Sequence, residues 1–334
     1  MDSLTQLVFS PLWQKAAGLL DFNGRLGLPF LTISLLVAFL LYRHQTRKGY
    51  SQAKSFGAFL GGRRIWLHRS ALVDYQYYFV RALLHLLFIL PILGWLDPVL
   101  LKSADVQALL ERLWGARPRV GENMAIMALY GLGAFVVSDF AHYWLHRAFH
   151  GRWLWEFHKV HHSATVMVPP TASRIHVMEK LSEMIVKGTL LALYGGIVYW
   201  LCGGEVDKYT LFGVSYMVLI FNSLAANLRH THIWLSFGPR IEHILNSPAQ
   251  HQIHHSRDPK HFNRNFGTNL SLWDWMFGTL YVTTQVPEQL EFGVGPKDNE
   301  RYMRIHNLIL RPFWVTAGKL LRALVSPLRH NNGN

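Results

Sequence analysis

Five long apolar stretches constrain the fold of this 334-residue chain more than any other feature. A helix that crosses a bilayer needs about 20 mostly apolar residues, and the stretches that approach this length are residues 26–42, 75–95, 124–141, 184–202 and 209–228. The second stretch is the weakest, because Arg81 and His85 interrupt it and Pro91 would kink it. Half of all residues are apolar and only 16% are charged, which is unusual for a soluble domain. We therefore predict an all-α integral membrane protein with about four to five transmembrane helices.

The distribution of charge predicts which side of the membrane each loop faces. Seven Lys and Arg residues and no acidic residue lie in residues 43–73, directly after the first apolar stretch. Loops of this kind stay in the cytosol, so five crossings leave residues 142–180 and 230–334 on the same, cytosolic side. The net charge of +13 is not accompanied by a nucleic-acid-binding motif, and we expect no nucleic-acid partner.

Fourteen of the 19 histidines lie between His142 and His261. The pattern H-x-x-H-H occurs twice, beginning at His158 and at His251. A further pair, His146 and His150, is spaced by four residues. The single cysteine excludes internal disulfides and cysteine-based metal clusters, so any metal ligands must be histidines or carboxylates.

The spacing within H-x-x-H-H favours two metal ions over one. On a helix the first histidine shares a face with each of the other two, whereas the two adjacent histidines diverge by about 100°. The two motifs and the pair supply eight imidazoles, about twice what one four-coordinate ion uses. We therefore predict a two-metal centre in a cytosolic helical cap. Imidazole suits iron, copper, zinc and nickel; zinc would imply hydrolysis or a structural role, and iron would imply oxygen activation.

The third apolar stretch continues without a helix breaker into the first histidine pair. We expect one long helix that carries Asp139, His142, His146 and His150 on one face. Asp139 lies one turn before His142 and two turns before His146. It is predicted to accept the N–H of a metal-ligating imidazole and so fix its tautomer.

These motifs resemble the fatty acid hydroxylase/sterol desaturase superfamily of integral-membrane, non-haem di-iron oxygenases. The similar segments are residues 138–150, 155–163, 230–231, 245–255, 265–267, 273–274 and 277–279. The resemblance covers roughly residues 124 to 281. It implies a catalytic domain at 124–281, after an N-terminal membrane-anchoring region with a basic cytosolic loop at 1–123 and before a basic cytosolic tail at 282–334. Within that tail, residues 311–329 form an amphipathic stretch suited to lying on the membrane.

The resemblance also implies nine metal ligands. Position by position, these fall on His146, His150, His158, His161, His162, His230, His251, His254 and His255. His142 stands where some relatives carry tyrosine, and His176 belongs to a pattern found in sterol-desaturase-like relatives. His232 stands where alkylglycerol monooxygenases, which residues 245–267 resemble, carry an acid. We expect Asp139, His142, His176 and His232 to lie around the metal site or its substrate pocket.

The implied function is hydroxylation or desaturation of a lipid C–H bond by two iron ions, O2 and two electrons, with zinc as a possible occupant of the purified protein. The implied partners are a lipid substrate, the membrane and an external electron donor such as a ferredoxin or a cytochrome. The implied location is the cytosolic face of a membrane, the inner membrane in bacteria. Two alternatives stay open. A zinc-dependent membrane hydrolase would use Glu156 or Glu179 as general base, and a metal transporter would place its ligands within the spans.

Overall fold

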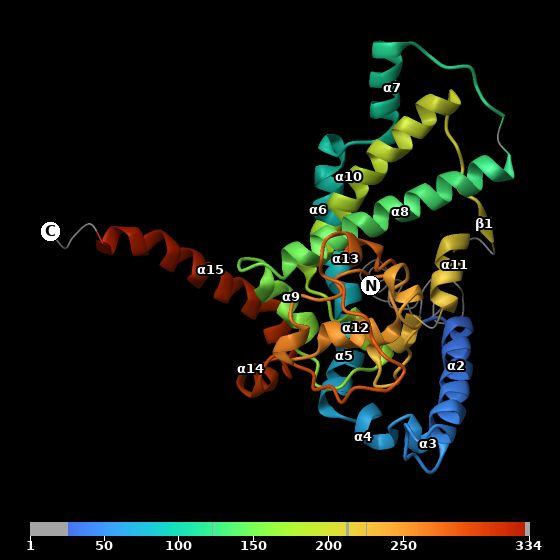
Figure 1. Cartoon of the computed structure of the whole chain (residues 1–334). Helices are drawn as coiled ribbons and strands as arrows, with labels where there is room; N and C mark the ends of the chain where they lie inside the picture. Colours follow the sequence, from blue (N-terminus) through green and yellow to red (C-terminus); the bar gives the residue numbers. More distant parts are fainter. Residues whose placement is uncertain (1–25, 122, 212–213, 225, 331–334) are drawn as a thin grey trace, which may run out of the picture.

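The computed structural model describes residues 26–330 except for residues 122, 212–213 and 225 (Figure 1). Residues 1–25 of the predicted N-terminal region, and 331–334, lie outside this part. Within the described residues the regular secondary structure is almost entirely helical, as the sequence predicts. Its strands, β1 (Thr210–Leu211) and β2 (Val214–Ser215), pair as a short antiparallel hairpin.

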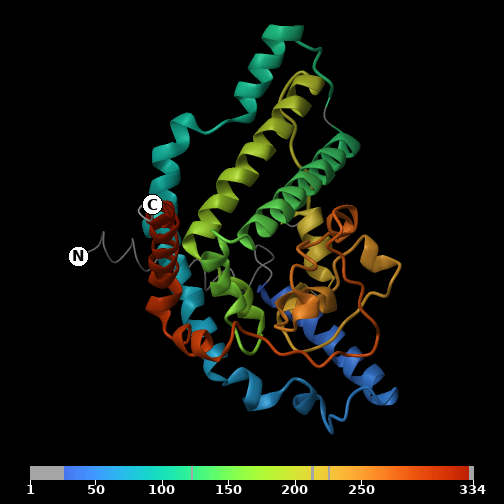
Figure 2. The same ribbon diagram turned by 60° about the vertical axis from the view of Figure 1, so that its left-hand side comes forward.

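Four helical segments are long and apolar enough to cross a membrane. They are α2 (Leu28–Arg47), the composite segment Arg69–Trp114, α8 (Met124–Phe149) and α10 (Val177–Cys202). In both views α10 lies between α7 (Ser103–Trp114) and α8 (Figures 1 and 2), and it packs against both. α2 instead lies lower in these views, where it packs against α11 (Tyr216–Ser223) and the turn Ala226–His230. The four candidates therefore do not form one parallel bundle.

The second apolar stretch is part of a longer, irregular helix. It comprises α5 (Arg69–Leu84), a π-helical turn (His85–Ile89) and α6 (Leu90–Leu96), and a 3-10 turn (Asp97–Val99) leads on toward α7. Pro91 has no N–H and its ring crowds the carbonyl of the preceding turn, which a local widening of the helix relieves. The expected disturbance at Pro91 is therefore present as a π turn directly before it.

The expected fifth span, residues 209–228, is wrong. This segment forms the hairpin, the eight-residue α11 and the turn Ala226–His230. It runs alongside α8, because the Tyr216 hydroxyl donates to the Ala128 carbonyl (2.7 Å) and the ring of Phe221 stacks on Phe135. α8 and α2 pack against α11 and cover part of its apolar surface, while Val218, Ile220 and Leu224 stay exposed. The hairpin and the eight-residue helix pair their own backbone groups, so the segment is not one continuous membrane helix. It still leads the chain from the far end of α10 to the histidines.

Short helices gather at the histidine-bearing end of α8 and form what we call the cap. They include α9 (Trp155–His162), α12 (Pro248–His255), α13 (Leu272–Met276) and α14 (Pro296–Arg301), with 3-10 turns at Pro169–Ser173, Ile241–His243 and Pro259–His261. A buried cluster that includes Tyr143, Phe221, Phe266 and Trp273 joins α8, α11 and the cap. The short helices α3 (Phe56–Phe59) and α4 (Gly62–Trp66) connect α2 to α5. The cap is thus built on the ends of the long helices.

The C-terminal helix α15 (Ile305–His330) projects from the cap (Figure 1). Its first half packs on α9 and α5. Farther along, Trp314, Leu321 and Leu324 are more than half exposed. The helix contains the predicted amphipathic stretch 311–329, and its position on a membrane surface stays a prediction.

Candidate metal centre

Three helical ends and one turn carry the predicted ligands. α8 supplies His146 and, at its C-terminal cap, His150. α9 supplies one H-x-x-H-H motif and α12 the other, while His230 ends the turn Ala226–His230. α12 begins where Ser247 caps the helix, Pro248 takes the first helical position and Gln250 completes a capping box. These local signals fix the start of α12 and therefore the direction in which its histidines project.

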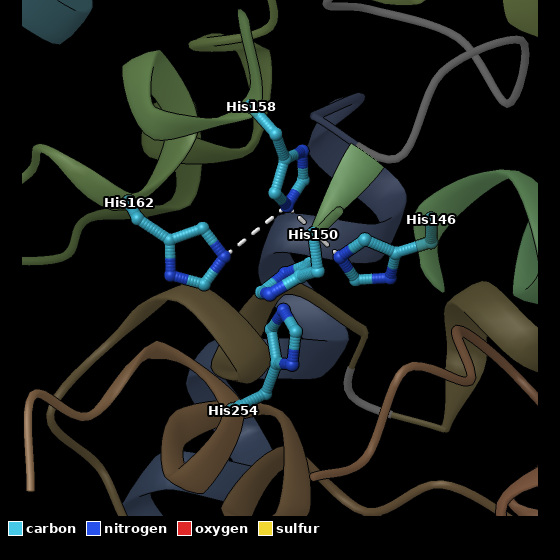
Figure 3. A group of neighbouring side chains, drawn as sticks. All are labelled: His146, His150, His158, His162 and His254. Carbon is cyan, nitrogen blue, oxygen red and sulfur yellow. Dashed lines mark hydrogen bonds between the residues drawn. The ribbon is translucent and has the colours of Figure 1, made fainter. Parts of the chain in front are cut away.

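The nine histidines fall into two groups in which the ligating nitrogen atoms lie within 4.8 Å of one another. The first group contains His146, His150, His158, His162 and His254 (Figure 3). The second group contains His161, His230, His251 and His255. The structure therefore brings together all nine positions that the resemblance implied.

The two H-x-x-H-H motifs contribute to these groups in a reciprocal way. In α9 the first and last histidines, His158 and His162, join the first group, and His161 joins the second. In α12 the corresponding pair, His251 and His255, joins the second group, and His254 joins the first. Adjacent histidines therefore always separate, as their divergence on a helix predicts.

The distances between ring nitrogens match those around a metal ion. In the first group the Nε2 atom of His158 lies 2.9 Å from that of His146 and 3.1 Å from that of His162. In the second, the Nε2 atom of His251 lies 3.1 Å from that of His230 and 3.2 Å from that of His255. Metal–nitrogen bonds of about 2.0–2.1 Å place neighbouring ligand atoms roughly 2.9–3.4 Å apart in octahedral or tetrahedral geometry. The spacing therefore suits one ion in each group.

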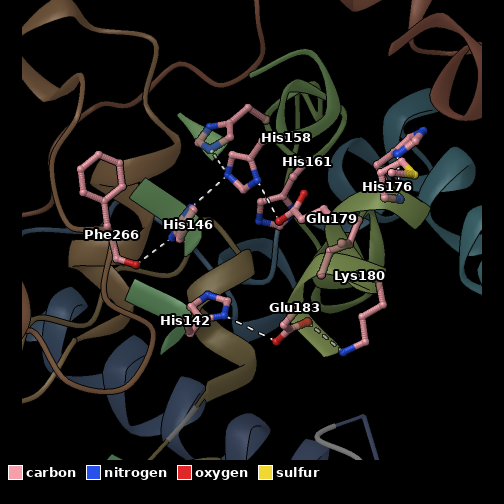
Figure 4. A network of polar contacts seen from close by, with 12 residues as sticks. His142, His146, His158, His161, His176, Glu179, Lys180, Glu183 and Phe266 are labelled. Carbon is pink, nitrogen blue, oxygen red and sulfur yellow. Dashed lines mark hydrogen bonds and ion pairs between the residues drawn. The ribbon is translucent and has the colours of Figure 1, made fainter. Parts of the chain in front are cut away.

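Hydrogen bonds to the outer nitrogens leave the inner nitrogens of the first group free for a metal. The Nδ1 atoms of His146 and His254 lie 2.7 Å and 2.8 Å from the carbonyl oxygens of Phe266 and Arg264. The Nδ1 atom of His158 lies 2.9 Å from a carboxylate oxygen of Glu179 (Figure 4). Because carbonyls and carboxylates only accept, Nδ1 carries the proton in each ring and Nε2 presents a lone pair.

The inward-facing Nε2 lone pairs can bind a metal ion only while the imidazoles are unprotonated. Burial of the rings keeps them in this neutral form. The Nε2 atoms of His150 and His254 are buried and have no hydrogen-bond partner among the described residues. Burial lowers the pKa of His158, His162, His251 and His255 well below the usual value for histidine, and neighbouring imidazoles lower it further. Burial also lowers the pKa of His254, to about 4. Neutral imidazoles with unpartnered nitrogens fit metal ions, and an all-nitrogen set fits iron, zinc or copper.

The loop between α12 and α13 supplies both carbonyl acceptors of the first group. Two carboxylates hold this loop in place. Asp274 accepts the N–H groups of Phe266 and Gly267, each at 2.8 Å. A side chain at Gly267 would collide with the Leu270 carbonyl and the Asp274 carboxylate, which explains the glycine in the Asn-Phe-Gly motif.

Asp139 is the second of these carboxylates, and its expected role is wrong. It accepts hydrogen bonds from the backbone of Asn269 and Leu270, the Asn269 amide and the Trp273 indole, at 2.9–3.2 Å. None of its hydrogen bonds in the described structure comes from an imidazole. The carboxylate that contacts a ligand-position ring is Glu179, which the sequence offered only as a candidate base. Asp139 instead ties α8 to the loop that positions His146.

The other three candidate residues lie at different distances from the two groups. The ring of His142 is tilted relative to that of His146, with ring centroids 5.6 Å apart, and its Nδ1 lies 3.5 Å from Glu183. His176 caps α10 through the Met178 N–H and contacts the Ile309 carbonyl at 2.9 Å. His232 contacts the Phe59 carbonyl at 2.8 Å. His142 thus adjoins the site, while His176 and His232 connect structural elements around it.

Fold and site together define a class of protein: a helical membrane protein with two adjacent all-histidine groups suited to two metal ions. Residues 131–279 match the family described as Fatty acid hydroxylase. This match fits the fatty acid hydroxylase/sterol desaturase superfamily, which the motifs predict.

Relatives of known activity support this placement. The chain is 30% identical to an alkylglycerol monooxygenase of Xenopus tropicalis over 55% of its length and 38% of the relative. It is 29% identical to an ornithine lipid hydroxylase of Rhizobium tropici over 52% of its length and 47% of the relative. It is also 29% identical to a very-long-chain aldehyde decarbonylase of Oryza sativa, over 42% of its length and 21% of the relative. The chain therefore spans less than half of each of these relatives, and no solved structure matches it.

Proposed function

We propose that this protein is a membrane-bound, non-haem di-iron oxygenase that hydroxylates or desaturates a C–H bond of a lipid, with hydroxylation as the first candidate. The observation that carries this proposal is the arrangement of nine imidazoles in two adjoining groups. Two neighbouring redox-active ions suit the two-electron reduction of dioxygen, and a donor set of nitrogens alone suits iron. The similarity to relatives named as a monooxygenase and a hydroxylase supports the same proposal.

In this proposal each histidine group holds one iron ion, and zinc is an alternative occupant after purification. Bound iron would supply the activation of O2, with two electrons from outside the chain. The protein holds the ligands in place: the Phe266 and Arg264 carbonyls and Glu179 orient three rings of the first group. All four rings of the second group, and four of five in the first, are buried, which restricts water at the centre.

The membrane setting and the partners follow from the same proposal. By the positive-inside rule, the basic segment 43–73 supports a cytosolic position for the cap, which would be at the inner membrane in a bacterium. A soluble ferredoxin or cytochrome would deliver electrons at that face, and the lipid substrate would enter from the bilayer. We retain 1–123, 124–281 and 282–334 as the anchoring, catalytic and tail regions.

Contacts at both candidate bases count against the zinc hydrolase. Glu179 is occupied by His158, and Glu156 accepts from Lys319 at 2.7 Å. The charged hydrogen bond from Lys319 makes Glu156 a poor general base. Glu179 contacts a neutral imidazole instead, and this contact engages it with a ligand-position ring. The metal transporter is also disfavoured, because seven of the nine ring positions lie on segments that follow α8 or α10 and belong to none of the candidate spans.

The test is reconstitution of the full chain with ferrous iron under anaerobic conditions, followed by a reductant, a lipid extract and isotopically labelled O2. We expect labelled hydroxyl groups or new double bonds in a lipid by mass spectrometry. Oxygen consumption without either product, or no consumption with sterols, acyl lipids and ether lipids, would contradict the proposal. Hydrolysed lipid formed by zinc-loaded protein without O2 would support the hydrolase instead.

A further inference from the structure

A pocket of about 620 Å³ opens directly onto the histidine groups. Its lining includes His150, His162 and His254 of the first group and His255 of the second. The rings of His162 and His255 stack with centroids 4.5 Å apart, so the pocket reaches the boundary between the two groups. Its volume falls in the range of about 300–1,000 Å³ that binds small ligands.

The charged side chains that line this pocket are all basic. They are Arg152, Lys159, Arg257 and Lys319, and no acidic residue is among the described residues of the lining. They come from segments far apart in the sequence: the α8–α9 connection, α9, the segment after α12, and α15. A one-sided charge assembled from four segments gives the pocket a positive potential.

Acidic residues behind the lining compensate only part of this charge. Lys159 pairs with Asp298 at 2.6 Å, and Lys319 pairs with Glu156 at 2.7 Å. Asp298 is also shared with Arg301 at 3.0 Å and lies 3.6 Å from Arg311. Asp298 therefore faces three cations, and the surroundings of the pocket keep a positive excess.

The two arginines are better placed than the lysines to bind a ligand. Arg257 contacts Glu291 at 3.3 Å, in a pair whose side chains are 40% and 80% exposed, so water weakens the pair. Arg152 lies over the ring of Trp153 and makes no ion pair among the described residues. A guanidinium group can bind a phosphate or a carboxylate through two parallel hydrogen bonds.

α15 connects this pocket with a surface suited to a lipid interface. Lys319 of α15 lines the pocket, and Trp314, Leu321 and Leu324 of the same helix are 62–74% exposed. A helix with exposed apolar and basic residues favours the boundary between lipid headgroups and acyl chains. The basic pocket therefore lies beside a segment expected at the depth of the headgroups.

We propose that this pocket binds the phosphate or carboxylate of an anionic amphiphile through Arg152 and Arg257. The inference rests on the proposed oxygenase function and specifies its substrate class: a lipid with a negatively charged polar end, which docks next to the metal centre. Lys159 and Lys319 add to the potential while they stay paired with Asp298 and Glu156.

The test measures binding to metal-free, full-length protein in an uncharged detergent by calorimetry, so that it does not depend on oxygenase activity. The probes are dioctanoyl phosphatidic acid, inorganic phosphate and uncharged dioctanoylglycerol. We expect phosphatidic acid to bind, and Arg152→Gln and Arg257→Gln each to weaken it roughly tenfold or more. Arg322→Gln is the matched control, because Arg322 lies on α15 one turn from Lys319 but does not line the pocket.

The outcomes separate the source of the anion from the existence of the site. Tighter binding of phosphatidic acid than of phosphate identifies a lipid headgroup, and equal affinities that both depend on Arg152 and Arg257 identify a free anion. Equal binding of the uncharged lipid, or unchanged affinity in both arginine variants with unchanged thermal stability, overturns the proposal. If binding is found but no oxygenase activity, the proposed function fails while the anion site stands.

Discussion

The two histidine groups differ in their support and in their access to solvent. The first has five rings, and three of them hydrogen-bond to Phe266, Arg264 and Glu179 outside the group. It also contributes three rings to the basic pocket. The second has four rings, all buried, and only His255 reaches that pocket. The Nδ1 atom of His251 has no hydrogen-bond partner among the described residues.

This difference indicates a division of labour between two ions of similar chemistry. An ion in the first group would have a surplus of ligands and lie beside the pocket where a substrate can dock. An ion in the second group would depend on all four rings and be shielded from the pocket. We therefore expect the first group to face the substrate and the second to tolerate no ligand loss.

The largest expected effect comes from replacing the adjacent residues His161 and His162. His161→Ala leaves three rings in the second group, so we expect the loss of one of the two ions and at least about a hundredfold loss of activity. His162→Ala leaves four rings in the first group, so we expect both ions to be retained and a smaller loss of activity. Iron per chain, measured by mass spectrometry of the metal, checks both.

His306→Ala is the control for this pair, because His306 is exposed on α15 and belongs to neither group. It should retain iron and activity. Equal iron loss in His161→Ala and His162→Ala would show that the groups are equivalent and would break the comparison.

The next effect concerns Glu179, which supports the first group only. Glu179→Ala removes the acceptor of the His158 N–H, and loss of such a partner typically costs about 10–100-fold in metal affinity or activity. Glu183→Ala is the matched control, because Glu183 lies one turn further along α10 and contacts His142, Lys180 and Lys187 rather than a ligand-position ring. Iron titration of both variants should show weaker binding only in Glu179→Ala. Equal weakening in both would mean that the negative charge near the site, and not the hydrogen bond to His158, supports iron binding.

Spacing patterns predicted eight of the nine histidines that the two groups contain. Histidine spacing on a helix is a local property, so the separation of His161 from His162 and of His254 from His255 follows from helical geometry alone. The reciprocal exchange between α9 and α12 does not, because it depends on how the two helices face each other. His230 could be placed only through the family resemblance, since it stands outside every repeated motif.

The sequence-based predictions were wrong where an apolar or charged residue contacts residues far away in the sequence. Residues 209–228 have the hydropathy of a span, but hydropathy does not distinguish contact with lipid from contact with α8. Asp139 has histidines one and two turns away, yet its donors are Asn269, Leu270 and Trp273. In each case the nearest sequence neighbours pointed to the wrong contact.

A smaller expected effect is a difference in the rate at which a soluble chelator removes iron from the two groups. When the iron-loaded protein is mixed with a soluble chelator, we expect two phases of iron loss, because the first group borders the pocket and the second is enclosed. The fast phase should comprise one ion per chain. It should slow when phosphatidic acid is bound in the pocket, whereas the slow phase should not change. A single phase for both ions would contradict the difference in access.

The smallest expected effect concerns Asp139, which supports the first group only indirectly, through the loop that contacts His146. Asp139→Asn places an amide N–H2 among four donors, so part of this buried set loses its acceptor, at a cost of about 1–3 kcal/mol in the free energy of unfolding. Because Asp139 contacts the loop and Trp273 but no imidazole, folded protein should still bind two ions. Denaturant unfolding and iron content of the same sample separate these effects. An unchanged unfolding free energy with loss of one ion would instead place Asp139 in direct support of a ligand, as its spacing from His142 and His146 first indicated.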